Sequence, residues 1–264
     1  MNLRLTVFLL LLLVGASCVS NKKYVLMQKS DINKTGLPLD SVVRTYAVHA
    51  PEYKIQPEDI ISVRFESLTP KDLDFLKTES SGVAANTGIP GGNALLTGEL
   101  VDRNGEIPFP FIGKVKVGGL SVFEIQDKLQ KIVEQYLDSP VVKARLVNFR
   151  FTILGEANHE GTVLLANNKV TILEAVGWAG GLKDMADKAN VKLIRNEGGR
   201  TTVQYINLLD ENFINSPYYY VYQNDILIVP ALKQRPYQTY VGKNLALLVS
   251  TLSLLILVVT LTKQ

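Results

Sequence analysis

Apolar residues are distributed along the chain in two ways: as a continuous run near each end, and at strand or helix spacing in the body between those runs. The second run, residues 245–261, has no charged side chain, and Lys243 and Lys263 lie on either side of it. As a helix it would measure about 25 Å, slightly less than the ~30 Å hydrocarbon core of an average bilayer. Flanking cations are typical of membrane interfaces. We therefore predict a transmembrane helix at residues 245–262, with a buried core helix as the alternative.

Small and polar residues form a narrow strip on this predicted helix. At spacings of four, three and seven, one helix face carries Ala246, Ser250, Ser253 and Thr260. Such a strip suits helix–helix packing or a water-lined lumen. Because Leu257 interrupts the strip, two roles stay open for the helix: lining a pore, or only anchoring the protein.

The first apolar run has the organisation of a secretory signal peptide at residues 1–17. Arg4 supplies the positive charge, residues 7–14 are apolar, and small residues come directly before Cys18. Cys18 is the only cysteine, so no disulfide can form within one chain. The stretch resembles the bacterial lipoprotein lipobox, although Gly15 stands where leucine is usual, and this implies lipid attachment (palmitate) at Cys18. An ordinary cleaved signal or a retained N-terminal anchor is the alternative.

The sequence after the signal predicts a tether and then a first folded unit. Residues 18–47 are polar without convincing periodicity, and we expect them to form a lipidated tether. In residues 48–150, alternating apolar residues predict short strands around hairpin turns. Ser121, with Glu124 three residues later, forms the capping-box pattern that starts a helix. The apolar face of this helix is predicted to contain Ile125, Leu129, Ile132, Val133 and Tyr136.

The second predicted unit, residues 151–230, repeats this design. Thr171 and Glu174 form another capping box, and Gly198-Gly199 separates two strands as in a hairpin. Residues 231–244 are expected to be a linker. The predicted fold class is therefore α+β: two small mixed domains followed by the C-terminal transmembrane helix.

The charge balance and the reactive residues give no sign of an enzyme or of a protein that binds nucleic acid. Lys and Arg total 28 against 25 Asp and Glu, with no block of like charges. The only histidines are His49 and His159, and no spacing of His, Cys or carboxylates predicts a metal or cofactor site. Asp59 and Asp225 each follow a turn and precede an apolar strand, so we expect their carboxylates to accept backbone N–H groups. Pairing them as glycosidase carboxylates is a remote alternative.

A tyrosine cluster precedes the last predicted strand. Strand alternation would place Tyr218, Tyr220 and Tyr222 on one face and Tyr219 on the other. Three roles are open for the first three: core and edge packing, a carbohydrate-facing surface, or a subunit interface, where tyrosine is favoured. Trp178 lies among apolar residues and is expected in the core.

Six segments of the body resemble, in this order, the outer-membrane polysaccharide export family, the Wza-like lipoproteins. Each segment alone is a weak match, but together they extend over most of the body. The segments are residues 53–63, 101–108, 111–121, 153–157, 171–181 and 223–230. The sequence departs from the family pattern where Glu58 and Asn224 stand in place of the glycine before each Asp, and where Glu160 stands in place of proline.

The resemblance implies a polysaccharide export sequence domain at residues 48–150 and one soluble-ligand-binding β-grasp (SLBB) domain at residues 151–230. It implies a non-enzymatic, ring-shaped homo-oligomer, a porin-like conduit that carries capsular or exopolysaccharide across the periplasm and outer membrane. The expected partners are the polysaccharide, the outer membrane and an inner-membrane polysaccharide co-polymerase. The protein would be lipid-anchored in the outer membrane, with its soluble domains in the periplasm. The alternative is an envelope glycan-binding or scaffold lipoprotein that forms no channel.

Overall fold

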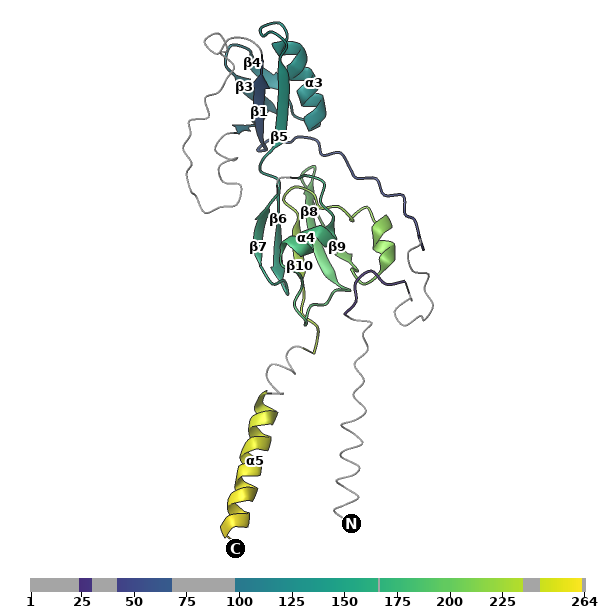
Figure 1. Cartoon of the computed structure of the whole chain (residues 1–264), viewed down its shortest axis with the longest axis vertical. Helices are drawn as coiled ribbons and strands as arrows, with labels where there is room; N and C mark the ends of the chain where they lie inside the picture. Colours follow the sequence, from purple (N-terminus) through teal and green to yellow (C-terminus); the bar gives the residue numbers. More distant parts are fainter. Residues whose placement is uncertain (1–23, 30–41, 68–97, 166, 235–242, 263–264) are drawn as a thin grey trace.

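The structure, a computed structural model, describes residues 24–29, 42–67, 98–165, 167–234 and 243–262. Its folded parts follow one another along the longest axis of the molecule (Figure 1): a small mixed unit, a second mixed unit, and helix α5 (Lys243–Thr262). Two predictions, the signal peptide at residues 1–17 and the lipid site at Cys18, lie outside the described residues.

The first unit is built on a three-stranded antiparallel sheet in the order β2-β1-β5. A two-stranded hairpin and helix α3, which packs against β5, complete it. The elements are β1 (Ile60–Glu66), β2 (Glu99–Leu100), β3 (Glu106–Phe109), β4 (Gly113–Lys116), α3 (Val122–Val133) and β5 (Val141–Leu146). In β5 every second side chain is buried, because successive side chains of a strand point to opposite faces. These side chains and the apolar face of α3 contribute to the core of this unit.

Helix α3 begins as the sequence predicts. The Ser121 hydroxyl accepts a hydrogen bond from the Glu124 amide at 3.3 Å, and the Glu124 carboxylate accepts one from the Ser121 amide at 2.6 Å. This reciprocal pair gives partners to amides that the start of a helix leaves unpaired. The prediction that Tyr136 lies on the buried face is wrong, since its side chain is 49% exposed. The helix ends at Val133, so helical spacing does not extend to that residue.

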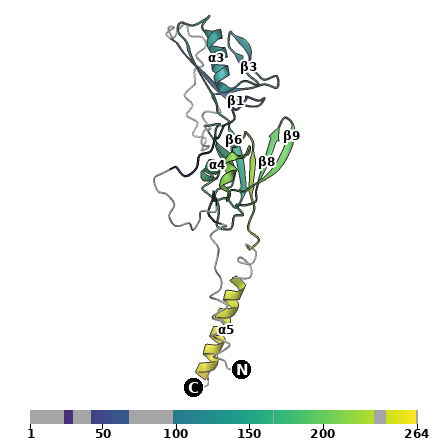
Figure 2. The same ribbon diagram turned by 90° about the vertical axis from the view of Figure 1, so that its right-hand side faces the viewer.

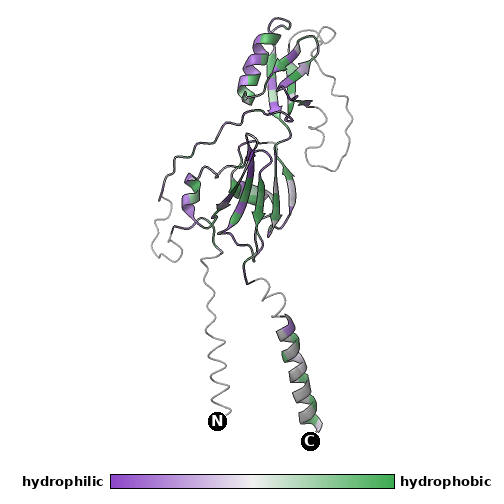
Figure 3. Ribbon diagram, turned by 180° about the vertical axis from the view of Figure 1, so that it is seen from behind, coloured by the Kyte–Doolittle hydropathy of each residue, from purple (hydrophilic) through white to green (hydrophobic). Residues whose placement is uncertain are grey.

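The second unit is a five-stranded sheet in the order β7-β6-β10-β8-β9, and helix α4 lies on one face of it (Figures 1 and 2). The elements are β6 (Arg150–Gly155), β7 (Gly161–Leu164), α4 (Ile172–Trp178), β8 (Val191–Glu197), β9 (Arg200–Ile206), the 3-10 helix η3 (Glu211–Asn215) and β10 (Ile226–Val229). Strands β6 and β10 run parallel, whereas the other neighbouring strands are antiparallel. Apolar residues predominate on β6 and β10, and polar ones on β9 (Figure 3). The α+β prediction is confirmed, although the sequence pattern did not predict β7.

Helix α4 carries the second predicted capping box, between Thr171 and Glu174. The expectation that Trp178 lies in the core is wrong, because its side chain is 64% exposed. The buried residues of α4 are Ile172, Ala175 and Val176. A helix turns by about 100° per residue, which places position 178 well to one side of this buried face.

Gly155 allows the two parallel central strands to come together where β6 ends. Its φ is 93°, in the region that favours glycine, and an added Cβ would overlap the carbonyl oxygen of Val229. The same carbonyl accepts a hydrogen bond from the Glu156 amide at 2.9 Å. Only glycine satisfies both the backbone conformation and the close approach at this position.

Helix α5 forms where the terminal helix is predicted, but the prediction that it spans a membrane is not supported. Within the described ranges, no helix is sufficiently long and apolar to cross a bilayer. The apolar run of about 25 Å falls short of an average hydrocarbon core, and hydroxyl side chains interrupt it. Ser250 and Ser253 of the predicted strip are exposed and donate hydrogen bonds to the carbonyls of Leu247 and Ser250 in the same helix. The side chains of Ala246 and Thr260 lie outside the described part of the chain.

Parts of the predicted tether, residues 18–47, pack on the second unit. The Lys188 ammonium donates a hydrogen bond to the Tyr24 carbonyl at 2.8 Å. The Arg44 guanidinium forms a bidentate ion pair with the Glu211 carboxylate, with both N–O distances at 2.6 Å. These contacts hold the described parts of the tether against the folded surface.

Candidate functional site

Each unit has a turn in which a residue with positive φ precedes a buried aspartate: Asp59 in the first unit and Asp225 in the second. Each turn contains a non-glycine residue in the left-handed region: Glu58 has a φ of 73°, and Asn224 a φ of 63°. The residues that follow them, Asp59 and Asp225, are 3% and 0% exposed. A positive φ favours glycine, which explains why the family that the sequence resembles has glycine at both positions.

Asp59 lies where the first unit meets the second. Its carboxylate accepts hydrogen bonds from the Gln56 amide and the Tyr53 hydroxyl, both at 2.8 Å, and from the side-chain amide of Gln223 at 3.5 Å. The prediction that Asp59 accepts a backbone N–H is therefore confirmed. Burial raises the pKa of Asp59, while these three hydrogen bonds oppose the rise. Burial, together with the neighbouring Asp59 carboxylate, raises the pKa of the Tyr53 phenol.

Asp225 is held by a buried arginine. The Nε and one terminal nitrogen of Arg195, which is 5% exposed, donate to the two carboxylate oxygens at 3.0 and 2.7 Å. That terminal nitrogen also donates to the Tyr220 carbonyl at 2.8 Å, and the Tyr222 amide donates to Asp225 at 2.7 Å. Burial raises the pKa of Asp225, and Arg195 and the Tyr222 amide oppose the rise. This geometry gives both buried charges direct partners, which is the condition for tolerating a buried ion pair.

Arg195 also organises the tyrosine cluster. Its guanidinium carbon lies 3.7 Å from the centre of the Tyr222 ring and 5.8 Å from that of the Tyr218 ring, both within cation–π range. Tyr219 packs instead against Phe213, with ring centres 5.7 Å apart. Tyr218 and Tyr222 thus share a partner that Tyr219 does not contact. Tyr220, however, packs edge-on against Tyr219, with ring centres 5.4 Å apart, so strand alternation does not describe the whole cluster.

A network of side-chain amides joins the two units. The Gln223 amide nitrogen donates to the Asn148 carbonyl at 3.0 Å, and the Gln223 oxygen accepts from the Arg150 amide at 2.8 Å. The Asn148 side chain accepts from the Ile60 amide at 2.9 Å and donates to the Glu58 carbonyl at 3.1 Å. Each turn is therefore bonded to the short segment between β5 and β6.

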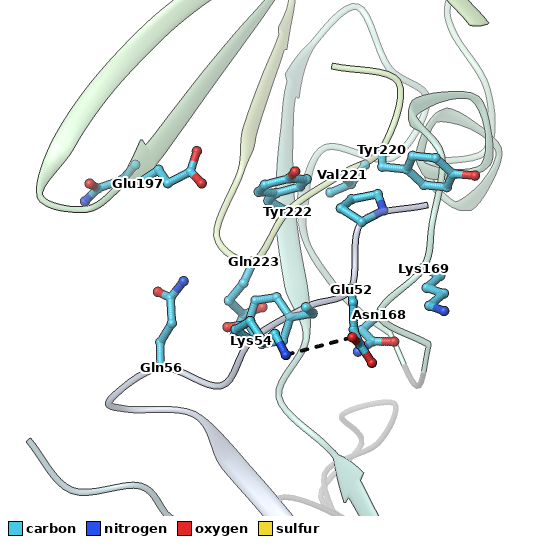
Figure 4. A pocket seen from close by; sticks show the side chains of 13 residues that line it. Glu52, Lys54, Gln56, Asn168, Lys169, Glu197, Tyr220, Val221, Tyr222 and Gln223 are labelled. Carbon is cyan, nitrogen blue, oxygen red and sulfur yellow. Dashed lines mark ion pairs between the residues drawn. The ribbon is translucent and has the colours of Figure 1, made fainter. Parts of the chain in front are cut away.

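A cavity of about 190 Å³ opens at this junction, between the segment before β1 and loops of the second unit (Figure 4). Tyr220 and Tyr222 line it from the second unit, whereas Tyr218 does not line it. Glu52 and Lys54 line it from the other side, with 3.8 Å between the carboxylate and the ammonium. The structure therefore brings two of the three predicted tyrosines into one polar cavity, beside charged side chains of both signs.

The remaining candidates for chemistry are the two histidines and the two buried aspartates. His49 is exposed, and His159 packs against Gly180, where an added Cβ would meet the imidazole. No group of three or more His, Cys, Asp or Glu is placed to hold a metal ion among the described residues. Asp59 and Asp225 are each engaged by protein donors, which gives no support to pairing them as glycosidase carboxylates.

Arg195 was not predicted as a site residue, although the sequence carries a signal for its burial. Alternation along β8 puts Arg195 on the same face as Val191 and Leu193, which are each 1% exposed. A cation in phase with buried apolar residues predicts a buried partner, because an unpaired buried charge is very costly. The junction network has no such local signal, because Gln223 and Asn148 are 75 residues apart in the sequence.

Comparison with known proteins finds two domain matches in succession. Residues 47–147 match the family described as polysaccharide biosynthesis/export protein, and residues 149–229 match the SLBB domain. The chain is similar to the EPS I polysaccharide export outer membrane protein EpsA of Ralstonia nicotianae, with 27% identity over 155 residues. It is equally similar to the protein of the same name from Ralstonia solanacearum, with 27% identity over 158 residues. These alignments cover 57% and 58% of this chain but 40% and 41% of the relatives, so the chain spans about two fifths of their length.

Proposed function

Because this chain belongs to the polysaccharide export family with an SLBB domain, we propose that it carries capsular or exopolysaccharide across the periplasm and outer membrane. Copies of the chain form a ring-shaped homo-oligomer, a porin-like conduit that works with an inner-membrane polysaccharide co-polymerase and performs no catalysis. The observation that carries this proposal is the succession of the two domain matches over residues 47–229. Closed rotational symmetry is the expected arrangement for such an assembly.

The proposed location is the outer membrane, with the soluble domains in the periplasm. Both relatives are named as outer membrane proteins, which supports the same location for this chain. A lipid on Cys18 supplies the anchor, since each CH₂ buried in a bilayer contributes about 0.8 kcal/mol. In this arrangement residues 18–47 tether the lipid to the export sequence domain (48–150), and residues 231–244 link the SLBB domain (151–230) to α5.

Helix α5 contributes to membrane attachment in this proposal. Its surface carries large apolar side chains that are between 47% and 65% exposed: Leu247, Val249, Leu254, Val258 and Leu261. Four of them, all except Val249, lie on one helix face at helical spacing, and such an exposed apolar face marks a surface that another apolar surface covers. The hydrogen bonds that Ser250 and Ser253 make within the helix lower the cost of placing their hydroxyls in that environment. We assign this cover to acyl chains of the outer membrane.

The junction cavity is the proposed point of contact with polymer. Tyr220 and Tyr222 line it beside hydrogen-bonding side chains, as in sites where an apolar face fixes a ligand and a few polar groups orient it. Tyr218 supports this surface through Arg195. The alternative role for these tyrosines is a contact between subunits.

A second candidate function is an envelope glycan-binding or scaffold lipoprotein that forms no channel. The observation that favours it is the junction cavity itself, in which two tyrosines lie beside hydrogen-bonding side chains, as in small-ligand sites. Purification of the full chain in mild detergent separates the two functions. A ring with an axial passage supports the conduit, and a stable monomer that binds oligosaccharide supports the second candidate.

Export is tested by removing the gene from its host and restoring it. We expect the deletion strain to lose surface polysaccharide and to regain it with the full chain. Cys18→Ser is expected to abolish acylation and reduce export, and removal of residues 243–264 to reduce export while both folded units remain intact. Surface polysaccharide at the normal level in the deletion strain would contradict the proposal.

A further inference from the structure

A second cavity, of about 360 Å³, adjoins the junction cavity. It lies between the start of α3, strand β5 and a loop of the second unit, and its own lining includes Phe123 and Arg145. The side chains that line both cavities are Glu52, Tyr53, Asn168 and Lys169. The two cavities are therefore neighbouring parts of one surface groove that crosses from the SLBB domain to the export domain.

The two parts of this groove differ in charge. The junction cavity has two cations and two anions in its lining: Lys54, Lys169, Glu52 and Glu197. In the lining of the second cavity Glu52 is the only anion; its carboxylate lies 3.8 Å from the Lys54 ammonium, whose closer partner is Glu124 at 2.6 Å. The cations there are Arg145 and Lys169, and neither forms an ion pair with any residue that the structure describes. Counted over the lining side chains, the first part has equal numbers of cations and anions, and the second has one more cation than anions.

The groove also presents aromatic side chains along its length. Tyr220 and Tyr222 lie in the junction cavity, and Phe123, which is 65% exposed, lies in the second. The face of an aromatic ring carries negative charge density and attracts the C–H groups of an apolar ligand face. A bare anion needs only the two cations, so the aromatic side chains point to a larger ligand with both apolar faces and negative charge.

We infer that the groove binds a segment of an acidic glycan. Sugar rings stack on Tyr220 and Tyr222, and carboxylates of acidic sugars meet Arg145 and Lys169 in the second cavity. A guanidinium pairs with a carboxylate through two parallel hydrogen bonds, whereas an ammonium acts as a compact point charge. This inference rests on the proposed export function and adds a class of polymer to it: one with negatively charged sugars.

The test compares two oligosaccharides of equal length on the full chain in detergent. Isothermal titration calorimetry at low salt measures the affinity for tetragalacturonate, which is acidic, and for cellotetraose, which is neutral. We expect the wild type to bind the acidic ligand at least about tenfold more tightly, and added salt to reduce this preference. The double variant Arg145→Gln, Lys169→Gln should bind both ligands alike. Lys143→Gln is the control for losing an exposed β5 cation outside the groove; unlike the test cations, Lys143 pairs with Glu66 at 2.7 Å, so circular dichroism checks the folding of this variant too.

The inference would be overturned if the wild type bound both oligosaccharides with equal affinity, or if the double variant kept the preference for the acidic one. It would also be overturned if Lys143→Gln lost that preference to the same extent, or if inorganic phosphate at the same concentration displaced tetragalacturonate. A double variant that changes oligomer size but not ligand preference would also overturn it, since the groove is then a subunit contact. The substituted side chains are exposed, so folding should survive, and circular dichroism checks this. Measuring export in cells that carry the same variants separates the two proposals. If the wild type exports polysaccharide but shows no preference for the acidic oligosaccharide, this inference fails while the proposed function stands.

Discussion

The Asp59 turn and the Asp225 turn share a backbone but differ in their electrostatic partners. In both, a left-handed residue precedes a buried Asp, and the carboxylate accepts the amide of the residue three positions before it. Asp59 has only neutral donors, among them Tyr53 and Gln223. Asp225 has the guanidinium of Arg195, which is itself buried.

The two turns therefore have the same backbone shape but should contribute differently to the free energy of unfolding. Glu58 and Asn224 both support the left-handed backbone, so the shape does not require glycine. The partner decides what is lost when the Asp is removed, because a neutral donor left alone costs less than a buried charge left alone. The second unit should therefore depend on its turn more strongly than the first.

The largest expected effect is that of Asp225→Ala. The variant leaves Arg195 buried without its carboxylate, and we expect the free energy of unfolding of the second unit to fall by about 3–5 kcal/mol. Asp59→Ala leaves neutral donors unpaired, and the first unit should lose about 1–3 kcal/mol. Urea denaturation gives the totals, and hydrogen exchange assigns each loss to its unit. A larger loss for Asp59→Ala would reverse the comparison.

Gly155→Ala should destabilise the second unit by roughly 2–5 kcal/mol. The left-handed backbone costs a non-glycine residue about 1–2 kcal/mol, and displacing the Val229 carbonyl on β10 adds about 1–3 kcal/mol. Gly199→Ala is the control, because Gly199 has a φ of 75° but open space around it, so the variant carries the backbone term alone. If urea denaturation gave equal losses of unfolding free energy for the two variants, the close approach to Val229 would contribute nothing to the loss, which would contradict this explanation.

The left-handed residues should respond differently to glycine. Glu58→Gly removes backbone strain of about 1–2 kcal/mol against an entropic cost of about 0.5–1 kcal/mol, so we expect a net gain of up to about 1.5 kcal/mol. Asn224→Gly should give no gain, because Asn tolerates this conformation and its side chain accepts a hydrogen bond from Arg150 at 2.9 Å. The thermal unfolding midpoint of each variant, compared with that of the wild type, measures the gain. A gain confined to Asn224→Gly would contradict this explanation.

The smallest expected effect is a pH dependence that Asp59 adds to stability. Burial raises its folded-state pKa above the unfolded value of about 4. Folding therefore favours the protonated form, so the contribution of Asp59 is greatest below the unfolded pKa and is lost as pH rises through the folded pKa. Asp59→Asn cannot ionise, so its stability relative to wild type should rise over that interval. Urea denaturation between pH 4 and pH 7 measures the slope, and a fall over this range would contradict the assignment.

The sequence predicted the features that depend on near neighbours. Both capping boxes, the strand alternation in β5 and the hairpin between β8 and β9 are formed by residues a few positions apart, where periodicity and turn chemistry are informative. The expected backbone hydrogen bonds to Asp59 and Asp225 belong to the same class, because each joins residues three positions apart.

Features that depend on tertiary contacts were not predicted. The parallel pairing of β6 with β10 and the amide network around Asn148 join residues that are far apart in the sequence. Trp178 was misplaced because hydrophobicity suggested burial, whereas the short helix α4 turns that position away from its buried face. Of the residues around the candidate cavity, the sequence indicated only Tyr220 and Tyr222. Most of the remaining lining comes from distant segments, residues 51–54, 56, 168, 169, 196 and 197.

Photo-cross-linking from position 222 tests the central claim most directly, because it asks whether the junction cavity touches polymer during export. The full chain carrying a photoreactive amino acid in place of Tyr222 would be irradiated in cells that are producing polysaccharide. The account predicts an adduct between the protein and the polysaccharide, and none from the same substitution at the exposed Tyr205 on β9, which does not line the cavity. An adduct only with a second copy of the chain, or equal labelling from both positions, would contradict it.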